Sequence, residues 1–211
     1  MDKRQVVFEV FEVPDPIRIK KALKLIKRHF PIVKGLNVLD CGIALGGVAD
    51  LLSREGACSY GVDVNPRVIP GVVIKQADLN EALPDFGIKF DVVFAGEVIE
   101  HLFDDEQFVK NCREVLAPGG IFVITTPNLF FSLNRIIMLF GKMPFFAYES
   151  YHYHIYSKKT LFSLLRRNGF EVESFTSSHL LFSTRRNIFG KIFEVLADIF
   201  HGCARKAQGA H

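Results

Sequence analysis

Short apolar runs alternate with amphipathic stretches along most of this chain. The apolar runs have the length of buried strands and span residues 36–41, 58–64, 72–76, 90–95, 120–126, 170–177 and 199–203. Apolar positions at helical spacing fill residues 16–30, 47–55, 104–116, 133–139, 159–168 and 183–197, and residues 5–13 show a less regular extended pattern. Strands that alternate with helices predict an α/β fold with a mostly parallel sheet and helices on both faces.

Residues 127–157 break this alternation, because the segment is long, apolar and aromatic. A structureless loop of that length is unusual in a compact domain. We interpret the segment as a lid or substrate-side insertion, and the alternative is a core-packing helix followed by a loop. Pro66 and Pro70 leave little room for a helix after the second strand, so that crossover is predicted to be short.

Composition places the chain among ordinary folded domains. It has 211 residues, of which 49% are hydrophobic and 23% charged. We expect one domain over residues 1–211, with residues 1–34 as an N-terminal helical extension. The helix at 16–30 carries many basic residues, which suit either a nucleic-acid or lipid patch or a solvated face. We favour the solvated face, because the formal net charge is only +3.

The cysteines Cys41, Cys58, Cys112 and Cys203 form no CxxC pair and fit no zinc spacing. Reduced, mostly buried thiols are expected, which suits a cytoplasmic location. The first ten residues contain no apolar run typical of a signal peptide. Apolar runs of about 18 residues, as a membrane span needs, are also absent.

The segment Asp40–Gly47 carries the strongest local signal, because a strand ends there in a glycine-rich turn that opens a helix. Such a turn lets a ligand approach the backbone, and a helix start suits an anionic group. Asp63 ends the second strand, where an acid can accept hydrogen bonds from both ribose hydroxyls. These features predict an adenosine-containing cofactor. Asp40 argues against a pyrophosphate and for a cofactor with an ammonium group and a sulfonium.

Further segments follow in a fixed order. After Asp40-x-Gly42-x-Ala44-x-Gly46 come Gly61-Val62-Asp63-Val64, Gln76-Ala77-Asp78-Leu79, Phe90–Gly96 with Glu97-x-x-Glu100-His101, Leu116–Gly120, and Thr126-Pro127-Asn128. This series resembles the class I S-adenosylmethionine-dependent methyltransferases of the small-molecule type. It covers about residues 36–128 and, more loosely, 156–170. The resemblance implies a Rossmann-like, doubly wound, seven-stranded sheet and S-adenosyl-L-methionine as the cofactor.

The resemblance also implies the residues that bind the cofactor. They are Asp40, Gly42, Ile43, Ala44, Gly46, Asp63, Val64, Asp78, Leu79, Glu97 and Val98. Ala44 departs from the family, which usually has glycine at this position. The extra methyl group leaves open a shifted or weakened cofactor.

Methyl transfer from a sulfonium is an in-line displacement that depends mainly on positioning, and an oxygen acceptor benefits from a general base. Glu97, Glu100 and His101 are spaced to share one face at a helix start. His101 is the candidate base, and the alternative is a structural histidine in a charge cluster. Tyr151, His152 and His154 are predicted to line the acceptor pocket. We assign no metal, because this His-x-His pair has no obvious third ligand.

The predicted function is methyl transfer to a small molecule or to a sugar, lipid or quinone-like acceptor. Alternatives are a non-catalytic protein that binds S-adenosylmethionine or adenosine, and an NAD-dependent oxidoreductase. Nucleic-acid modification is a further class, but Ala95–Val98 stands where methylators of base amines often have an N/D-P-P-Y/F sequence. We therefore expect no nucleic-acid partner. The sequence assigns no oligomeric state.

Overall fold

The computed structural model describes residues 16–128, 132–142, 152–178 and 198–206. The helices are α1 (Pro16–His29), α2 (Gly47–Arg54), the short 3-10 helix η2 (Ile99–His101), α3 (Asp105–Val115), α4 (Ser132–Leu139) and α5 (Lys158–Arg167). The strands are β1 (Asn37–Cys41), β2 (Cys58–Asp63), β3 (Val72–Gln76), β4 (Phe90–Gly96), β5 (Leu116–Asn128), β6 (Phe170–Ser178) and β7 (Asp198–Lys206).

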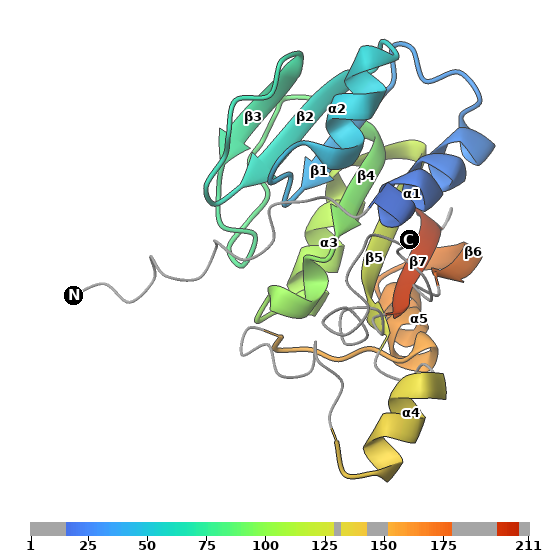
Figure 1. The fold of residues 1–211 in the computed structure, drawn as a ribbon. Coiled ribbons are helices and arrows are strands. Elements are labelled where there is room, and N and C mark those ends of the chain that lie inside the picture. Colours follow the sequence, from blue (N-terminus) through green and yellow to red (C-terminus); the bar gives the residue numbers. More distant parts are fainter. Residues whose placement is uncertain (1–15, 129–131, 143–151, 179–197, 207–211) are drawn as a thin grey trace.

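The strands form one sheet in the order β3-β2-β1-β4-β5-β7-β6 (Figure 1). The first five strands in this order pair in parallel, and β7 pairs antiparallel with both β5 and β6. The predicted α/β fold with a mostly parallel sheet is therefore confirmed for its five parallel strands. The direction of the chain across the sheet reverses at β1, which lies between β2 and β4.

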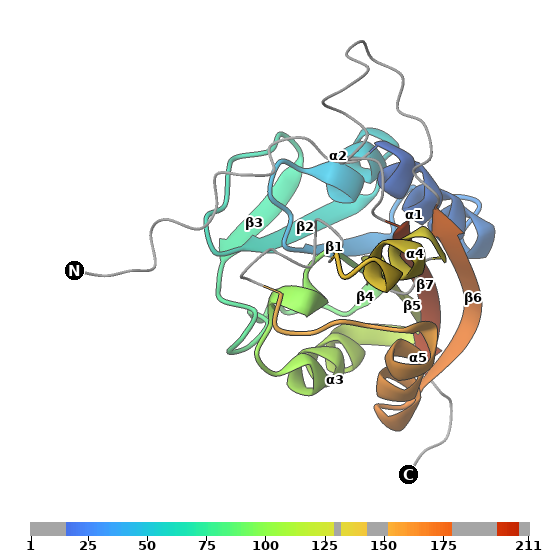
Figure 2. The same cartoon turned by 60° about the horizontal axis from the view of Figure 1, so that its bottom comes forward.

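Helices cover both faces of the sheet, as predicted (Figure 2). On one face, α1 and α2 bury Ala22, Ile26 and Leu52 against side chains of β1, β4 and β5. On the other face, α3 and α5 bury a larger cluster that includes Phe108 and Leu164. Successive strand residues point to opposite faces, so β4 supplies Val92 and Phe94 to the first cluster and its neighbours to the second.

The pattern of apolar residues predicts most element bounds closely, but β5 is longer than expected. It begins at Leu116 and continues to Asn128, so the first residues of the supposed 127–157 insertion belong to the sheet. Asn128 also forms an isolated parallel bridge with Tyr156, which ties the end of that segment to the same strand. Between these points α4 projects beyond the carboxyl ends of the strands (Figure 1).

Two further expectations concern the crossovers and membranes. Residues 64–71 contain no helix, which confirms the short crossover predicted from Pro66 and Pro70. Among the helices that the structure describes, none has the length and hydrophobicity of a membrane-spanning helix. The extended pattern at 5–13 and the helix predicted at 183–197 lie outside the described residues.

Candidate active site

The carboxyl ends of β1, β2 and β4 meet at one edge of the sheet. Cys41, which ends β1, pairs with Val62 of β2 on one side and with Ala95 of β4 on the other. The loop after β1, Asp63 and the residues after β4 are therefore neighbours. In open α/β sheets this switch point is where ligands bind.

The turn that follows β1 is held tightly against its surroundings. Gly42 has a φ of 72°, and a Cβ placed on it would lie 2.5 Å from Cγ2 of Val98. Ile43 is buried over Gly61 of β2, where a Cβ would lie 2.5 Å from Cδ1 of Ile43. Two of the predicted cofactor residues, Gly42 and Ile43, thus act in the structure as close-packing positions that set the path of the loop.

Ala44, the departure from the motif, adopts the left-handed conformation with a φ of 45°. Its amide donates a hydrogen bond to Oδ2 of Asp63 at 2.9 Å. The other oxygen, Oδ1, accepts a hydrogen bond from the Asn65 amide at 2.9 Å. The carboxylate of Asp63 is therefore fixed in orientation next to the exposed loop residue Ala44.

Asp40 lies beneath the loop and is almost fully buried. Its Oδ2 accepts a hydrogen bond from the Ala49 amide at 3.1 Å, so it caps the first turn of α2, whose N-cap residue Gly46 has no side chain for that purpose. Burial raises the pKa of Asp40 from 3.8 to about 7, although the bond from Ala49 and the nearby charge of Arg18 oppose this change.

The residues after β2 and β3 form the next part of this edge. Gln76 donates a hydrogen bond through Nε2 to the carbonyl of Val64 at 2.8 Å. Asp78 is exposed, and its Oδ1 accepts from the Asn80 amide at 2.9 Å. Asn80 in turn accepts at Oδ1 from the Phe103 amide at 2.7 Å. Leu79 is buried in the core, whereas the carboxylate of Asp78 is exposed at this edge of the sheet.

The expected helix start at Glu97 is wrong. Glu97 has a φ of 58°, and the only helical turn nearby is the 3-10 turn Ile99–His101. The Glu97 amide donates to the carbonyl of Thr125 at 3.1 Å, and Thr125 donates through Oγ1 to Oε1 of Glu97 at 3.0 Å. These contacts with β5 override the local helical spacing and place Glu97 outside the turn.

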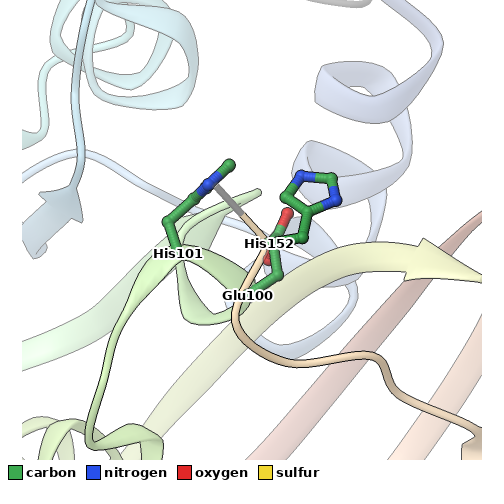
Figure 3. A group of neighbouring side chains, drawn as sticks. All are labelled: Glu100, His101 and His152. Atoms are coloured by element: carbon green, nitrogen blue, oxygen red, sulfur yellow. The ribbon is translucent and has the colours of Figure 1, made fainter. Parts of the chain in front are cut away.

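Glu100 and His101 nevertheless come together with His152, which is 51 residues further along the chain than His101 (Figure 3). One ligand atom from each side chain lies within 4.8 Å of the others. The imidazole rings of His101 and His152 have centroids 4.7 Å apart. Burial raises the pKa of Glu100 well above its ordinary range, and the charge of Glu97 adds to the increase.

Backbone contacts hold the segment of His152 in place. The amides of Tyr153 and His154 donate to the carbonyl of Glu100 at 2.8 and 3.2 Å. Of the residues predicted to line the acceptor pocket, His152 therefore lies beside His101. His154 lies further along, with Nε2 3.3 Å from the Phe103 carbonyl and Nδ1 3.9 Å from Oδ2 of Asp105. Tyr151 lies outside the described residues.

Arg18 of α1 acts electrostatically at this edge of the sheet, although the sequence favoured a solvated face for the basic residues of its helix. Its charge acts on both Asp40 and Glu100, since it lowers the pKa of each carboxyl group. Its Nε is buried and has no hydrogen-bond partner within the described part of the chain. Helical spacing cannot separate Arg18 from the exposed Lys20 and Lys24 of the same helix, because only the tertiary fold brings it to this edge.

A family profile described as a methyltransferase domain matches residues 16–174. This range includes the loop after β1 and the cluster of Glu100, His101 and His152. The chain belongs to this methyltransferase family. The resemblance of the motif series to the class I S-adenosylmethionine-dependent methyltransferases is thereby confirmed.

Curated relatives agree with this assignment. A probable S-adenosylmethionine-dependent methyltransferase from Mycolicibacterium smegmatis is 36% identical over 148 residues, which are 66% of this chain and 53% of the relative. A ubiquinone biosynthesis O-methyltransferase from Azorhizobium caulinodans is 33% identical over 148 residues, which are 60% of this chain and 54% of the relative. The chain spans about half the length of these relatives.

Solved structures show the same fold. One is 1,6-didemethyltoxoflavin-N1-methyltransferase from Burkholderia thailandensis, with bound 1,6-didemethyltoxoflavin and S-adenosylhomocysteine. The two structures share a TM-score of 0.65 at 15% identity, and the match covers 92% of this chain and 80% of the other. At this level of identity the likeness concerns the fold.

The residues at the sheet edge fit an S-adenosyl cofactor. A carboxylate offers about four acceptor sites, and Asp63 uses one on each oxygen for the amides of Ala44 and Asn65. Acceptor capacity therefore remains for the two hydroxyls of a ribose. The exposed Asp78 lies on the next loop along the same edge.

Proposed function

We propose that this protein transfers a methyl group from S-adenosyl-L-methionine to a small molecule of the sugar, lipid or quinone-like type. The observation that carries this proposal is the hydrogen bond from Ala44 to Asp63 at the switch point of the sheet. It places an oriented acid against the glycine-rich turn, on the same edge as His101 and His152.

On the cofactor side, Asp63 holds the ribose and Asp78 the adenine. The turn from Gly42 to Gly46 passes beneath the remainder of the cofactor, with Ile43 packed over β2 and Gly42 packed against Val98 after β4. Arg18, whose charge reaches this edge, supplies a cation for the carboxylate at the other end of the cofactor. Glu97, whose side chain accepts a hydrogen bond from Thr125, is the remaining residue of the proposed cofactor site and follows β4.

On the acceptor side, the imidazole rings of His101 and His152 lie next to each other, with centroids 4.7 Å apart (Figure 3). The cofactor supplies an activated methyl group on a positively charged sulfur. The protein holds the acceptor in line with that group, which accounts for most of the acceleration expected in such a displacement. His101 is the residue placed to take the proton of a hydroxyl acceptor.

An aromatic acceptor suits the side chains at the mouth of this region. Phe103 and Tyr153 are 66% and 53% exposed, and their ring centroids are 4.2 Å apart. Exposed aromatic rings next to a polar site favour a flat, partly apolar ligand. The ubiquinone O-methyltransferases among the relatives support the same class of acceptor.

Calorimetric titration with S-adenosyl-L-methionine tests the cofactor half of this proposal. We expect binding by the wild type and a loss of at least roughly 100-fold in affinity for Asp63→Ala, because the substitution removes two hydrogen bonds to a charged group, each of about 1.5–3 kcal/mol. The matched control is Asp85→Ala, which removes an exposed carboxylate that accepts a hydrogen bond from the Gly87 amide at 2.7 Å. Absence of binding by the wild type would refute the proposal.

A further inference from the structure

The cluster of Glu100, His101 and His152 has the composition of a metal site. Its three ligand atoms come from a helical turn and a distant segment, and they lie within 4.8 Å of one another. Figure 3 shows the Glu100 carboxylate and both imidazoles converging on the same small region. In the sequence, the pair of His152 and His154 has no visible third ligand, so no metal was expected. The fold brings Glu100 and His101 to His152, and these two residues supply the further ligands.

An independent observation points to a ligand at this place. Glu100 is 1% exposed, and its Oε2 accepts a hydrogen bond from Oγ1 of Thr126 at 3.0 Å. Its Oε1 is buried and has no hydrogen-bond partner among the described residues. A buried carboxylate oxygen without a donor is costly and rare. A cation bound to Oε1 removes that cost.

Backbone hydrogen bonds hold the segments of the cluster together in the absence of a cation. The carbonyl of Glu100 accepts from the amides of Tyr153 and His154, so the residue that follows His152 is already fixed to the turn that carries Glu100 and His101. A tetrahedral ion with bonds of about 2.1 Å holds its ligand atoms roughly 3.4 Å apart. The ligand atoms lie within 4.8 Å of one another, so they would draw together by at most about 1.4 Å on binding.

The donor atoms of the cluster indicate the class of cation. Two imidazoles and a carboxylate form a mixed nitrogen and oxygen donor set. Such a set suits zinc and neighbouring first-row divalent ions better than Mg²⁺, which prefers oxygen ligands.

We propose that Glu100, His101 and His152 bind one divalent transition-metal cation of the Zn²⁺ or Mn²⁺ type at the acceptor side of the active site. Three protein ligands leave an open position, as in catalytic metal sites. That position faces the space assigned to the acceptor, so the cation would hold an acceptor oxygen and His101 would serve as a ligand instead of a base. This consequence for catalysis rests on the proposed function, whereas the binding itself does not.

Calorimetric titration of the chelator-treated full chain with Zn²⁺, Mn²⁺ or Mg²⁺ tests the site without cofactor or acceptor. We expect one Zn²⁺ or Mn²⁺ per chain and at least ~10-fold weaker binding by His152→Gln and Glu100→Gln, since even outer-shell changes weaken metal sites by about 10- to 100-fold. The matched control is His154→Gln, because this neighbouring histidine is outside the cluster and should leave the metal affinity unchanged.

Absence of Zn²⁺ and Mn²⁺ binding by the wild type would overturn the proposal, and so would unchanged affinity in both His152→Gln and Glu100→Gln. Binding of Mg²⁺ as tight as that of Zn²⁺ would overturn the assignment of a transition metal. Thermal unfolding of each variant in the presence of chelator separates loss of the site from loss of the fold. If metal binding fails while S-adenosyl-L-methionine still binds, only this inference falls; the reverse result removes the proposed function and keeps the metal site.

Discussion

The amide of Ala44 donates a hydrogen bond to Oδ2 of Asp63 at 2.9 Å while Ala44 itself is left-handed, with a φ of 45°. The residue that departs from the family motif is therefore one of the two whose amides orient Asp63, the acid proposed to bind the ribose. Its methyl group does not prevent this conformation, but it makes the conformation strained, since the left-handed region costs an L-residue about 1–2 kcal/mol.

Ala44→Gly should consequently preserve the fold and leave the stability equal or slightly higher. Relief of the left-handed strain, about 1–2 kcal/mol, is partly offset by the greater flexibility of glycine, about 0.5–1 kcal/mol. The net gain expected in the free energy of unfolding is about 0–1 kcal/mol, measured by urea denaturation. Ala44→Val should be destabilised, since β-branched residues are outliers in this region. A large loss of stability in Ala44→Gly would contradict the inference that the backbone of Ala44 is strained.

Gly42→Ala should destabilise the protein by more than the backbone conformation alone explains. The new Cβ would lie 2.5 Å from Cγ2 of Val98, so the loop or the valine must shift. Gly35→Ala is the matched control, because Gly35 has a φ of 82° and nothing within 4 Å of a Cβ. We expect a further loss of about 1–3 kcal/mol in Gly42→Ala relative to Gly35→Ala, as in overpacked cores. Equal losses would show that the contact with Val98 does not constrain the loop.

Asp40→Asn should flatten the dependence of stability on pH between about 4 and 7. The pKa of Asp40 is raised in the folded protein to about 7 from 3.8, so the folded state keeps a proton that the unfolded state has lost. Stability of the wild type therefore falls as pH rises through this range, by roughly 4 kcal/mol from this group alone. Asparagine retains an oxygen for the Ala49 amide and carries no charge. Urea denaturation of both proteins across this range checks the prediction, and identical slopes would contradict it.

The strands of the sheet could be predicted from the sequence because most of them are short apolar runs separated by helices or turns. The bounds of β3 and α1 illustrate this, since a run of apolar residues and a helical period are local properties. The extension of β5 to Asn128 was missed, because its last residues are polar or proline and are recruited by pairing with β7 and with Tyr156. Pairing of that kind depends on distant residues.

The candidate site likewise combines features that local sequence predicts with features that depend on the tertiary fold. The turn and Asp63 could be recognised because they belong to one continuous unit of strand, turn, helix and strand. The helix expected from Glu97 onward was wrong because Thr125, on another strand, fixes Glu97 outside the helical region. The proximity of His152 to His101 and the arrival of Arg18 at Asp40 and Glu100 arise from the tertiary fold. Neither the ring contact of the two histidines nor the electrostatic effect of Arg18 can be inferred from periodicity in the sequence.

A crystal structure with S-adenosylhomocysteine bound tests the proposed site most directly. We expect the ribose hydroxyls on the carboxylate of Asp63, the adenine at the loop of Asp78 and the sulfur directed toward His101 and His152. Adenosine bound elsewhere, or at this edge of the sheet with the sulfur turned away from both histidines, would contradict the proposed function.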